Sequence, residues 1–323
     1  MKHTPRVIIT LVSFFFIAQF TGLLVINHYI DHKKTVETKA VAWQPLPYNL
    51  ERPEVKNQSS SFIYIIISIL IGTVLVLLII KFNKPLIWKL WFFITVWLTL
   101  AIAFAAFINN IIAAVIALII SILKLYKPNM MIQNFSEIFI YGGLAAIFVP
   151  VVNIFAAFML LILISAYDFV AVYKTKHMIK MAKFQASSNI FAGLLVPYAQ
   201  ENQRFSGHQK SKGFFSEKDK VQQKASISKF KIKKSIKIPK KQSVAVLGGG
   251  DIGFTLIFAG VVMKGLMLQE PVLIGFLKTL IIPFFVSLAL SILLFKGQHN
   301  KFYPAMPILS LGCFIGYLVV LII

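Results

Sequence analysis

Nine apolar runs constrain the fold of this 323-residue chain more than any other feature of its sequence. Most of them approach the roughly 20 residues that an α-helix needs to cross the hydrocarbon core of a bilayer. Hydrophobic residues make up 58% of the chain and charged residues only 14%, whereas about a quarter of a soluble domain is charged. The sequence therefore predicts an all-α polytopic membrane protein with about nine transmembrane helices. The runs cover residues 7–27, 61–82, 85–107, 109–126, 136–150, 151–173, 244–267, 271–295 and 303–323.

The distribution of Lys and Arg predicts how the spans are oriented. Short cytoplasmic connections carry an excess of these residues, and this bias sets the orientation of membrane proteins. The excess falls on alternate connections, and those near 107–109 and 150–151 carry no charge. We therefore predict a multi-pass protein of the cell membrane with a cytoplasmic N-terminus and a C-terminus outside. The basic connections contain Lys81 and Lys84, Lys124 and Lys127, the segment 174–243, and Lys296 and Lys301.

A long basic loop between the sixth and seventh predicted spans divides the chain. Seventeen Lys and Arg lie between Lys174 and Lys241 against three acidic residues, so this loop carries most of the formal net charge of +22. Basic tracts next to a membrane attract anionic lipid at about 1 kcal/mol per residue, and we expect that partner rather than nucleic acid. The predicted organisation is an N-terminal part (residues 1–183), a flexible basic loop (184–243) and a C-terminal part (244–323).

The last part of this loop alternates apolar and polar residues. Residues 226–238 alternate in the manner of a β-strand, and Pro239 ends the run. Two interpretations stay open: a basic amphipathic segment on the bilayer surface, or an edge strand that pairs with an extended peptide. The second interpretation makes Ile236 and Ile238 candidate substrate-binding residues.

Two acidic residues lie well inside apolar runs, Asp168 in the sixth and Asp251 in the seventh. An ionisable group at bilayer depth costs several kcal/mol, so it marks a functional site by default. Two carboxyl groups held close together share a proton, and one then takes a proton from water while the other polarises a peptide carbonyl. The same pair also suits a cation channel or a proton-coupled transporter, and the spacing alone does not separate these functions.

Zinc and serine chemistry fit this sequence poorly. The chain has six histidines, all outside the interiors of the predicted spans, and it has no His-Glu-x-x-His motif. A zinc site or a Ser-His pair at bilayer depth is therefore not expected. We predict neither a metal nor another cofactor.

Three short motifs carry a resemblance to a known family. Tyr167-Asp168 resembles the Tyr-Asp motif of presenilins, residues 248–251 (GGGD) resemble their Gly-x-Gly-Asp motif, and residues 304–307 (PAMP) resemble their Pro-Ala-Leu motif. The motifs occur in the family's order and in the expected sixth, seventh and ninth spans, with Met306 in place of leucine. Over roughly its C-terminal half, the chain thus resembles the presenilin and signal peptide peptidase family of GxGD intramembrane aspartyl proteases.

The resemblance implies an intramembrane aspartyl protease that cleaves single-span membrane proteins, with Asp168 and Asp251 as its catalytic pair. The predicted orientation is similar to that of presenilin and opposite to that of signal peptide peptidase. A prepilin-type peptidase also has a Gly-x-Gly-Asp motif, but it is not expected to have the 304–307 element in a ninth span. The residues expected to bind substrate beside the pair are Tyr167, Gly248, Gly250, Pro304, Ala305, Met306 and Pro307.

Each of these neighbours has a physical reason to be there. Gly248 and Gly250 allow a substrate backbone to approach closely. Pro304 and Pro307 disfavour a regular helix and leave backbone groups available to an extended substrate. For Tyr167, a hydrogen bond near the pair and simple packing are both consistent with the sequence.

Overall fold

The computed structural model describes residues 5–55, 57–82, 84–175, 181, 184–185, 190–199, 242–296 and 303–323. The chain forms two compact units. One comprises Met1–Val196 with Ala245–Ile323 and contains the apolar helices; the other is Pro197–Val244, of which residues 197–199 and 242–244 are described. The predicted strand at 226–238, with Ile236 and Ile238, lies outside the described residues.

Seven helices in the described part of the chain are long and apolar enough to cross a membrane. Two shorter apolar helices, Asn110–Tyr126 and Met306–Ile322, coincide with the fourth and ninth predicted runs. The all-α polytopic fold class is confirmed, and nine remains the predicted number of spans. The seven longer segments are Pro5–Tyr29, Gln58–Lys81, Pro85–Ala105, Met130–Val151, Ile154–Lys174, Gly249–Leu266 and Val272–Lys296.

The elements follow one another as the apolar runs predict, with short turns between most of them. The α-helices are α1 (Pro5–Tyr29), α2 (His32–Thr38), α3 (Ser61–Lys81), α4 (Pro85–Ala105), α5 (Asn110–Tyr126), α6 (Met130–Phe148), α7 (Ile154–Phe169), α10 (Gly249–Leu266), α11 (Val272–Thr279), α12 (Ile281–Lys296) and α13 (Met306–Ile322). The single turns are η1 (Pro47–Asn49), η2 (Gln58–Ser60), η3 (Val149–Val151) and the π-helical η4 (Val170–Lys174), and the strands are β1 (Gly193–Ala199) and β2 (Gln242–Gly248), which form one two-stranded sheet.

Asparagine side chains begin three of these helices. Asn109, Asn129 and Asn153 each cap the helix that follows, because the side-chain oxygen accepts a hydrogen bond from a backbone amide two or three residues further on. The first amides of a helix have no partner within it, and such a cap satisfies one of them. These polar residues therefore define where α5, α6 and α7 start.

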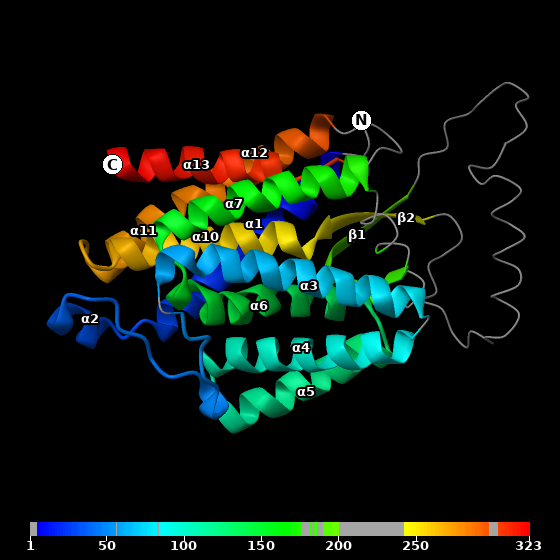
Figure 1. Cartoon of the computed structure of the whole chain (residues 1–323), viewed down its shortest axis with the longest axis horizontal. Helices are drawn as coiled ribbons and strands as arrows, with labels where there is room; N and C mark the ends of the chain where they lie inside the picture. The colour runs from blue at the N-terminus through cyan, green and yellow to red at the C-terminus, as the bar shows by residue number, and fades with distance from the viewer. Residues whose placement is uncertain are drawn as a thin grey trace, which may run out of the picture. The chain divides into compact units, whose positions relative to one another are not determined.

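Helices α1, α6 and α10 form the centre of the helical unit. Of the residues in the apolar windows of α6 and α10, 61% are buried, against 6% in α3. Helix α1 packs against α6, α10 and α12, and α10 also contacts α6, α7 and α13. Figure 1 shows α4 and α5 on one side of this centre and α12 and α13 on the other. The centre therefore places α10, which carries Asp251, among most of the other long helices.

Small residues allow α12 and α13 to pack closely. Gly312 and Gly316 lie four residues apart on the face of α13 that meets α12. A Cβ atom added at Gly312 would lie 3.0 Å from the Cα of Val286, and one at Gly316 would lie 2.9 Å from the Cα of Ile282. Small residues at this spacing let membrane helices approach until their backbones touch, and dispersion then holds them together.

Three element boundaries differ from the sequence prediction. Helix α6 begins at Met130 instead of residue 136, because the polar side chains of its first turns are buried against partners. Helix α10, which corresponds to the seventh predicted run, begins at Gly249 instead of residue 244, because residues 242–248 pair with β1 as strand β2. The eighth run is interrupted at Leu280, where α11 ends and α12 follows.

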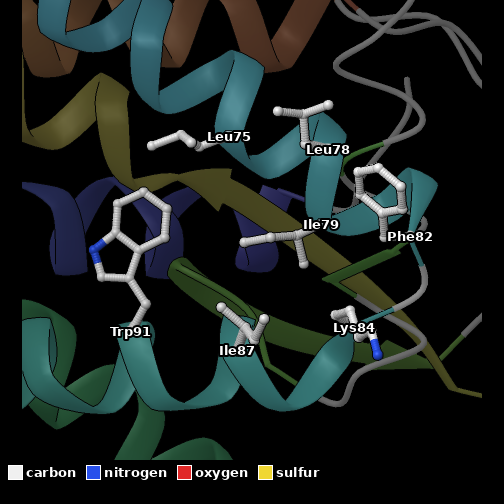
Figure 2. Close-up of a pocket in the computed structure, with 7 residues that line it drawn as sticks. All are labelled: Leu75, Leu78, Ile79, Phe82, Lys84, Ile87 and Trp91. Carbon is white, nitrogen blue, oxygen red and sulfur yellow. The ribbon is translucent and has the colours of Figure 1, made fainter.

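An apolar pocket of about 310 Å³ lies between the last turns of α3 and the first turns of α4 (Figure 2). Helix α3 contributes one wall and α4 the other, with Lys84 in the turn between them. Neither aspartate nor any other predicted site residue lines this pocket. Its lining consists of Leu75, Leu78, Ile79, Phe82, Lys84, Ile87 and Trp91.

Candidate active site

Asp168 lies in the last turn of α7, and only 7% of its surface is exposed. Directly after it, the helix widens into the π-helical turn η4, a local distortion that is frequent at functional sites. The backbone amide of Met306 donates a hydrogen bond to Oδ2 of Asp168 at 3.2 Å, and Ala305 lies beside the same carboxyl group. The start of α13 therefore holds the Asp168 side chain.

The start of a helix is suited to this task. The first amides of α13 have no carbonyl partner within their own helix, so they are free to donate to an acceptor in front of it. One turn further on, the hydroxyl groups of Ser165 and Ser310 are hydrogen-bonded at 2.9 Å and join α7 to α13 a second time. The two contacts fix the position of Asp168 relative to α13.

Asp251 lies in the first turn of α10, directly after the chain changes from strand to helix. Gly248, the last residue of β2, lies beside its carboxyl group, and the dipole of a helix favours acidic side chains in this turn. A Cβ atom at Gly248 would lie 3.3 Å from Oδ2 of Asp251, closer than an ordinary van der Waals contact. Glycine at this position therefore leaves room for the carboxyl group.

The structure brings the two aspartates together, although they are far apart in the sequence. Their carboxyl groups are close enough to interact electrostatically. Contacts between α7, α10 and α13 support this arrangement, because each of the three helices packs against the other two. The sixth, seventh and ninth predicted runs therefore meet at one place.

The other predicted site residues differ in what they contact. The hydroxyl group of Tyr167 is hydrogen-bonded to Oγ1 of Thr73 at 2.9 Å, so this side chain reaches α3. A Cβ atom at Gly250 would meet only the ring of Phe254, at 3.6 Å, so nothing in the structure requires glycine there for space. Ile236 and Ile238 lie outside the described residues.

Residues 304–307 contribute mainly through their backbone. Pro304 and Met306 are buried, and Ala305 is partly buried. Pro307 is the second residue of α13, a position where its missing amide breaks no hydrogen bond within the helix. The backbone groups of this segment were expected to be available to substrate, but the amide of Met306 donates to Asp168 in this structure.

Two polar residues near Asp251 were not predicted. Nε2 of Gln19 on α1 donates to the carbonyl of Ile252 at 2.9 Å and to Oγ1 of Thr255 at 2.7 Å. Tyr141 on α6 packs against Gly249, where a Cβ atom would lie 2.5 Å from the tyrosine hydroxyl. A sequence signal for the first existed, because Gln19 is a polar amide within the first apolar run.

A sequence signal for the second also existed. Gln133, Glu137 and Tyr141 are spaced by four residues, which places them on one face of a helix. The predicted span begins only at residue 136, after Gln133, so this spacing lay partly outside it. Among the residues that the structure describes, no group of three or more His, Cys, Asp or Glu is arranged to hold a metal ion.

The chain matches a family model described as signal-peptide peptidase, presenilin aspartyl protease over residues 45–323. The match includes all three motifs and extends well upstream of them, through the second to fifth predicted spans. No curated protein sequence shows a significant match to the chain.

Solved structures of a presenilin family intramembrane aspartate protease have a similar fold. The structure in space group C222 has a TM-score of 0.55 at 17% sequence identity and covers 97% of this chain and 98% of its own. The structure in space group P2 has a TM-score of 0.54 at 15% identity and covers 97% and 96%. The fold is therefore shared over nearly the whole length, including the first spans, where the sequence motifs gave no resemblance.

Proposed function

Because this chain belongs to the signal-peptide peptidase and presenilin family of aspartyl proteases, it is an intramembrane aspartic endopeptidase, and we propose that Asp168 and Asp251 are its catalytic pair. One observation carries this assignment: three segments far apart in the sequence converge on the two carboxyl groups. Asp168 comes from α7, Asp251 from the first turn of α10, and the amide of Met306 from the start of α13.

The proposed chemistry uses the pair as a general base and a general acid. The ionised carboxyl group takes a proton from water while the protonated one donates to the oxygen of the peptide carbonyl. The water oxygen bonds to the carbonyl carbon and gives a tetrahedral diol. The diol then collapses: the C–N bond breaks, the nitrogen receives a proton from the pair, and a carboxyl group and an amine are released.

Fixed geometry supports these roles. A general base and a general acid act on one water molecule and one carbonyl only when both are held in place, and well-oriented groups lower a barrier by about 7–11 kcal/mol relative to free ones. The backbone amide of Met306 holds Asp168 here, and Asp251 is placed by the strand-to-helix turn that begins at Gly248. Backbone donors of this kind do not depend on a side-chain rotamer.

The proposed substrates are membrane-embedded proteins with a single span. A substrate helix must unwind before water reaches a carbonyl, because the groups of an intact helix are already hydrogen-bonded. The β1–β2 sheet ends directly before Asp251, and a sheet edge can hold an unwound chain by main-chain hydrogen bonds. The strand expected around Ile236 and Ile238 would add to such a platform and stays a prediction.

The proposed orientation has the N-terminus and the basic segment 174–243 in the cytoplasm and the C-terminus outside. The distribution of Lys and Arg supports it, and the same basic segment is the proposed contact with anionic lipid. Protease added to sealed cells should leave this segment intact, and protease added to inverted vesicles should cut it. Cutting of this segment in intact cells would show that it lies outside and would contradict the proposed orientation.

Cleavage of a single-span substrate by the purified protein in liposomes tests the catalytic pair. Wild type should release product, whereas Asp168→Ala and Asp251→Ala should each abolish it, because neither remaining carboxyl group can supply both roles. Asp31→Ala is the matched control, since Asp31 caps the short helix α2 and should leave cleavage unchanged. Product from either active-site variant, in an equally folded preparation, would refute the assignment.

A further inference from the structure

A buried polar network on α6 lies next to the start of α10 and has no part in the chemistry proposed above. All of its members come from α5 and α6, and all are at most 8% exposed. We call it the α6 network; it consists of Lys124, Gln133, Asn134, Ser136, Glu137 and Tyr141.

Glu137 is the hub of this network. Its Oε1 accepts hydrogen bonds from Nζ of Lys124 at 2.5 Å and from Nε2 of Gln133 at 3.0 Å. Its Oε2 accepts a hydrogen bond from the hydroxyl group of Tyr141, and Lys124 also donates to Ser136 at 2.9 Å. Every oxygen of the carboxylate is thus occupied by a side chain of α5 or α6.

One arm of the network holds the strand β1. Nε2 of Gln133 donates to the carbonyl groups of Phe191 and Gly193 at 2.8 and 3.0 Å. The side chain of Asn134 bonds Leu195 in both directions, donating to its carbonyl at 2.8 Å and accepting from its amide at 2.9 Å. Asn134 therefore binds β1 as a neighbouring strand would.

The other arm reaches the turn that precedes Asp251. A Cβ atom at Gly249 would lie 2.5 Å from the hydroxyl oxygen of Tyr141, and one at Gly253 would lie 3.6 Å from its ring. The hydroxyl is also near enough to Asp251 for the two groups to interact electrostatically. Tyr141 therefore lies against the first turn of α10, and the missing Cβ atom of Gly249 leaves room for its hydroxyl group.

Both arms act on the same junction. Strand β1 pairs with β2, β2 continues directly into α10, and the amide of Gly249 donates to the carbonyl of Ala192 at 3.3 Å. The network therefore acts on the strand-to-helix turn from two sides. Gln133 binds β1, which pairs with β2, and Tyr141 contacts the turn directly from α6.

Stability alone is a poor explanation for this arrangement. Lys124 and Glu137 are charged, are 4% and 1% exposed, and lie between helices. Taking two such charges out of water costs about as much as their attraction returns, and apolar residues of similar volume often leave stability unchanged or raise it. A buried pair is better explained by a need for one defined geometry than by its contribution to folding.

We propose that Glu137 and Tyr141 are positioning residues of the protease: through the two arms of the α6 network they fix the 248–251 turn, and with it the place of the Asp251 carboxyl group relative to Asp168. This inference rests on the proposed function. It differs from it in that neither residue touches the substrate or exchanges a proton with it.

The first test removes one hydroxyl group. Tyr141→Phe should lower kcat by about tenfold or more, because small misplacements of a catalytic group are costly, and should leave KM within about twofold. Tyr29→Phe is the matched control: its hydroxyl is also buried and donates to a backbone carbonyl, that of Ile102 at 2.8 Å, but it lies at the far end of α1. This variant should keep the kcat of wild type.

A second test separates positioning from folding. The triple variant Lys124→Met/Glu137→Met/Tyr141→Phe, in which no tyrosine hydroxyl is left without its acceptor, should keep or raise the melting temperature and yet lower kcat as far as Tyr141→Phe does. Glu137→Gln, which keeps acceptor and shape, should retain an intermediate kcat. A non-cleavable analogue of the tetrahedral diol should bind the variants more weakly by the factor lost in kcat/KM, because such analogues report transition-state geometry.

The outcomes are distinct. Wild-type kcat in both Tyr141→Phe and the triple variant would overturn the proposal. A triple variant that loses melting temperature and kcat together would also overturn it, since the network would then be a structural element. Asp168→Ala and Asp251→Ala, measured in the same preparation, report separately on the catalytic pair, so a failure of the proposed function is not confused with a failure of this inference.

Discussion

The contact between α12 and α13 gives the sharpest prediction about stability. Gly316→Ala adds one methyl group where the nearest atom is backbone, the Cα of Ile282 at 2.9 Å, followed by its Cγ1 at 3.4 Å and the carbonyl of Ile281 at 3.5 Å. A side chain can rotate away from such a contact, but a backbone atom moves only with its helix. We therefore expect α13 to shift, and Met306, whose amide contacts Asp168, to shift with it.

The magnitude follows from two opposing effects. An extra methyl group in a well-packed interior costs about 1–3 kcal/mol, whereas replacing glycine by alanine within a helix gains about 1 kcal/mol. Gly72→Ala in α3 isolates the second effect, because a Cβ atom there has nothing within 4 Å. The difference in free energy of unfolding between the two variants should therefore be about 1–3 kcal/mol, with Gly316→Ala the less stable.

Unfolding by sodium dodecyl sulfate, followed by circular dichroism, measures this difference, and the cleavage rate of a single-span substrate reports the consequence for the active site. Gly72→Ala should unfold at the same or a higher detergent concentration than wild type and cleave at the same rate. Gly316→Ala should unfold earlier and cleave more slowly. Equal stability of the two variants, within about 0.5 kcal/mol, would refute the argument from close backbone packing.

Two further predictions concern polar contacts between helices. Lys264→Met removes hydrogen bonds to two backbone carbonyls that follow α6 and should lower the free energy of unfolding by about 1–3 kcal/mol. Lys278→Met loses a partly exposed ion pair and should lower it by less than about 1 kcal/mol. Equal losses in the two variants would contradict this ranking of the two contacts. Thr73→Val removes the contact of α3 with Tyr167 and should lower the free energy of unfolding by only about 0.6 kcal/mol, while amide hydrogen exchange in α3 becomes faster. Unchanged exchange would show that this contact does not hold α3 in place.

The positions of the spans were accessible from the sequence because the signal is local. About 20 consecutive apolar residues identify a membrane helix whatever its neighbours are, and the runs at 61–82 and 85–107 correspond closely to α3 and α4. The two buried aspartates stood out for the same reason, since an acidic residue in an apolar run is conspicuous in one dimension. The order of the three motifs then indicated the family, which the family model confirmed.

The boundaries that failed are those where pairing overrides composition. Residues 244–247 are as apolar as the helix that follows, and only the neighbouring strand β1 makes them β2. The first turns of α6 looked like a loop because Gln133 and Asn134 are polar, yet both are buried against partners. Hydropathy records what a side chain is, not whether its hydrogen bonds are satisfied.

The same limit explains what the sequence revealed of the active site. It identified Asp168, Asp251 and the segment 304–307 as candidates, but not that the backbone amide of Met306 donates to Asp168. The four-residue spacing places Tyr141 on one helix face with Glu137, but it does not show that this face meets Gly249. Composition and spacing are properties of one chain segment, whereas a hydrogen bond or a close contact between helices depends on the distance between two segments, and only the folded arrangement sets that distance.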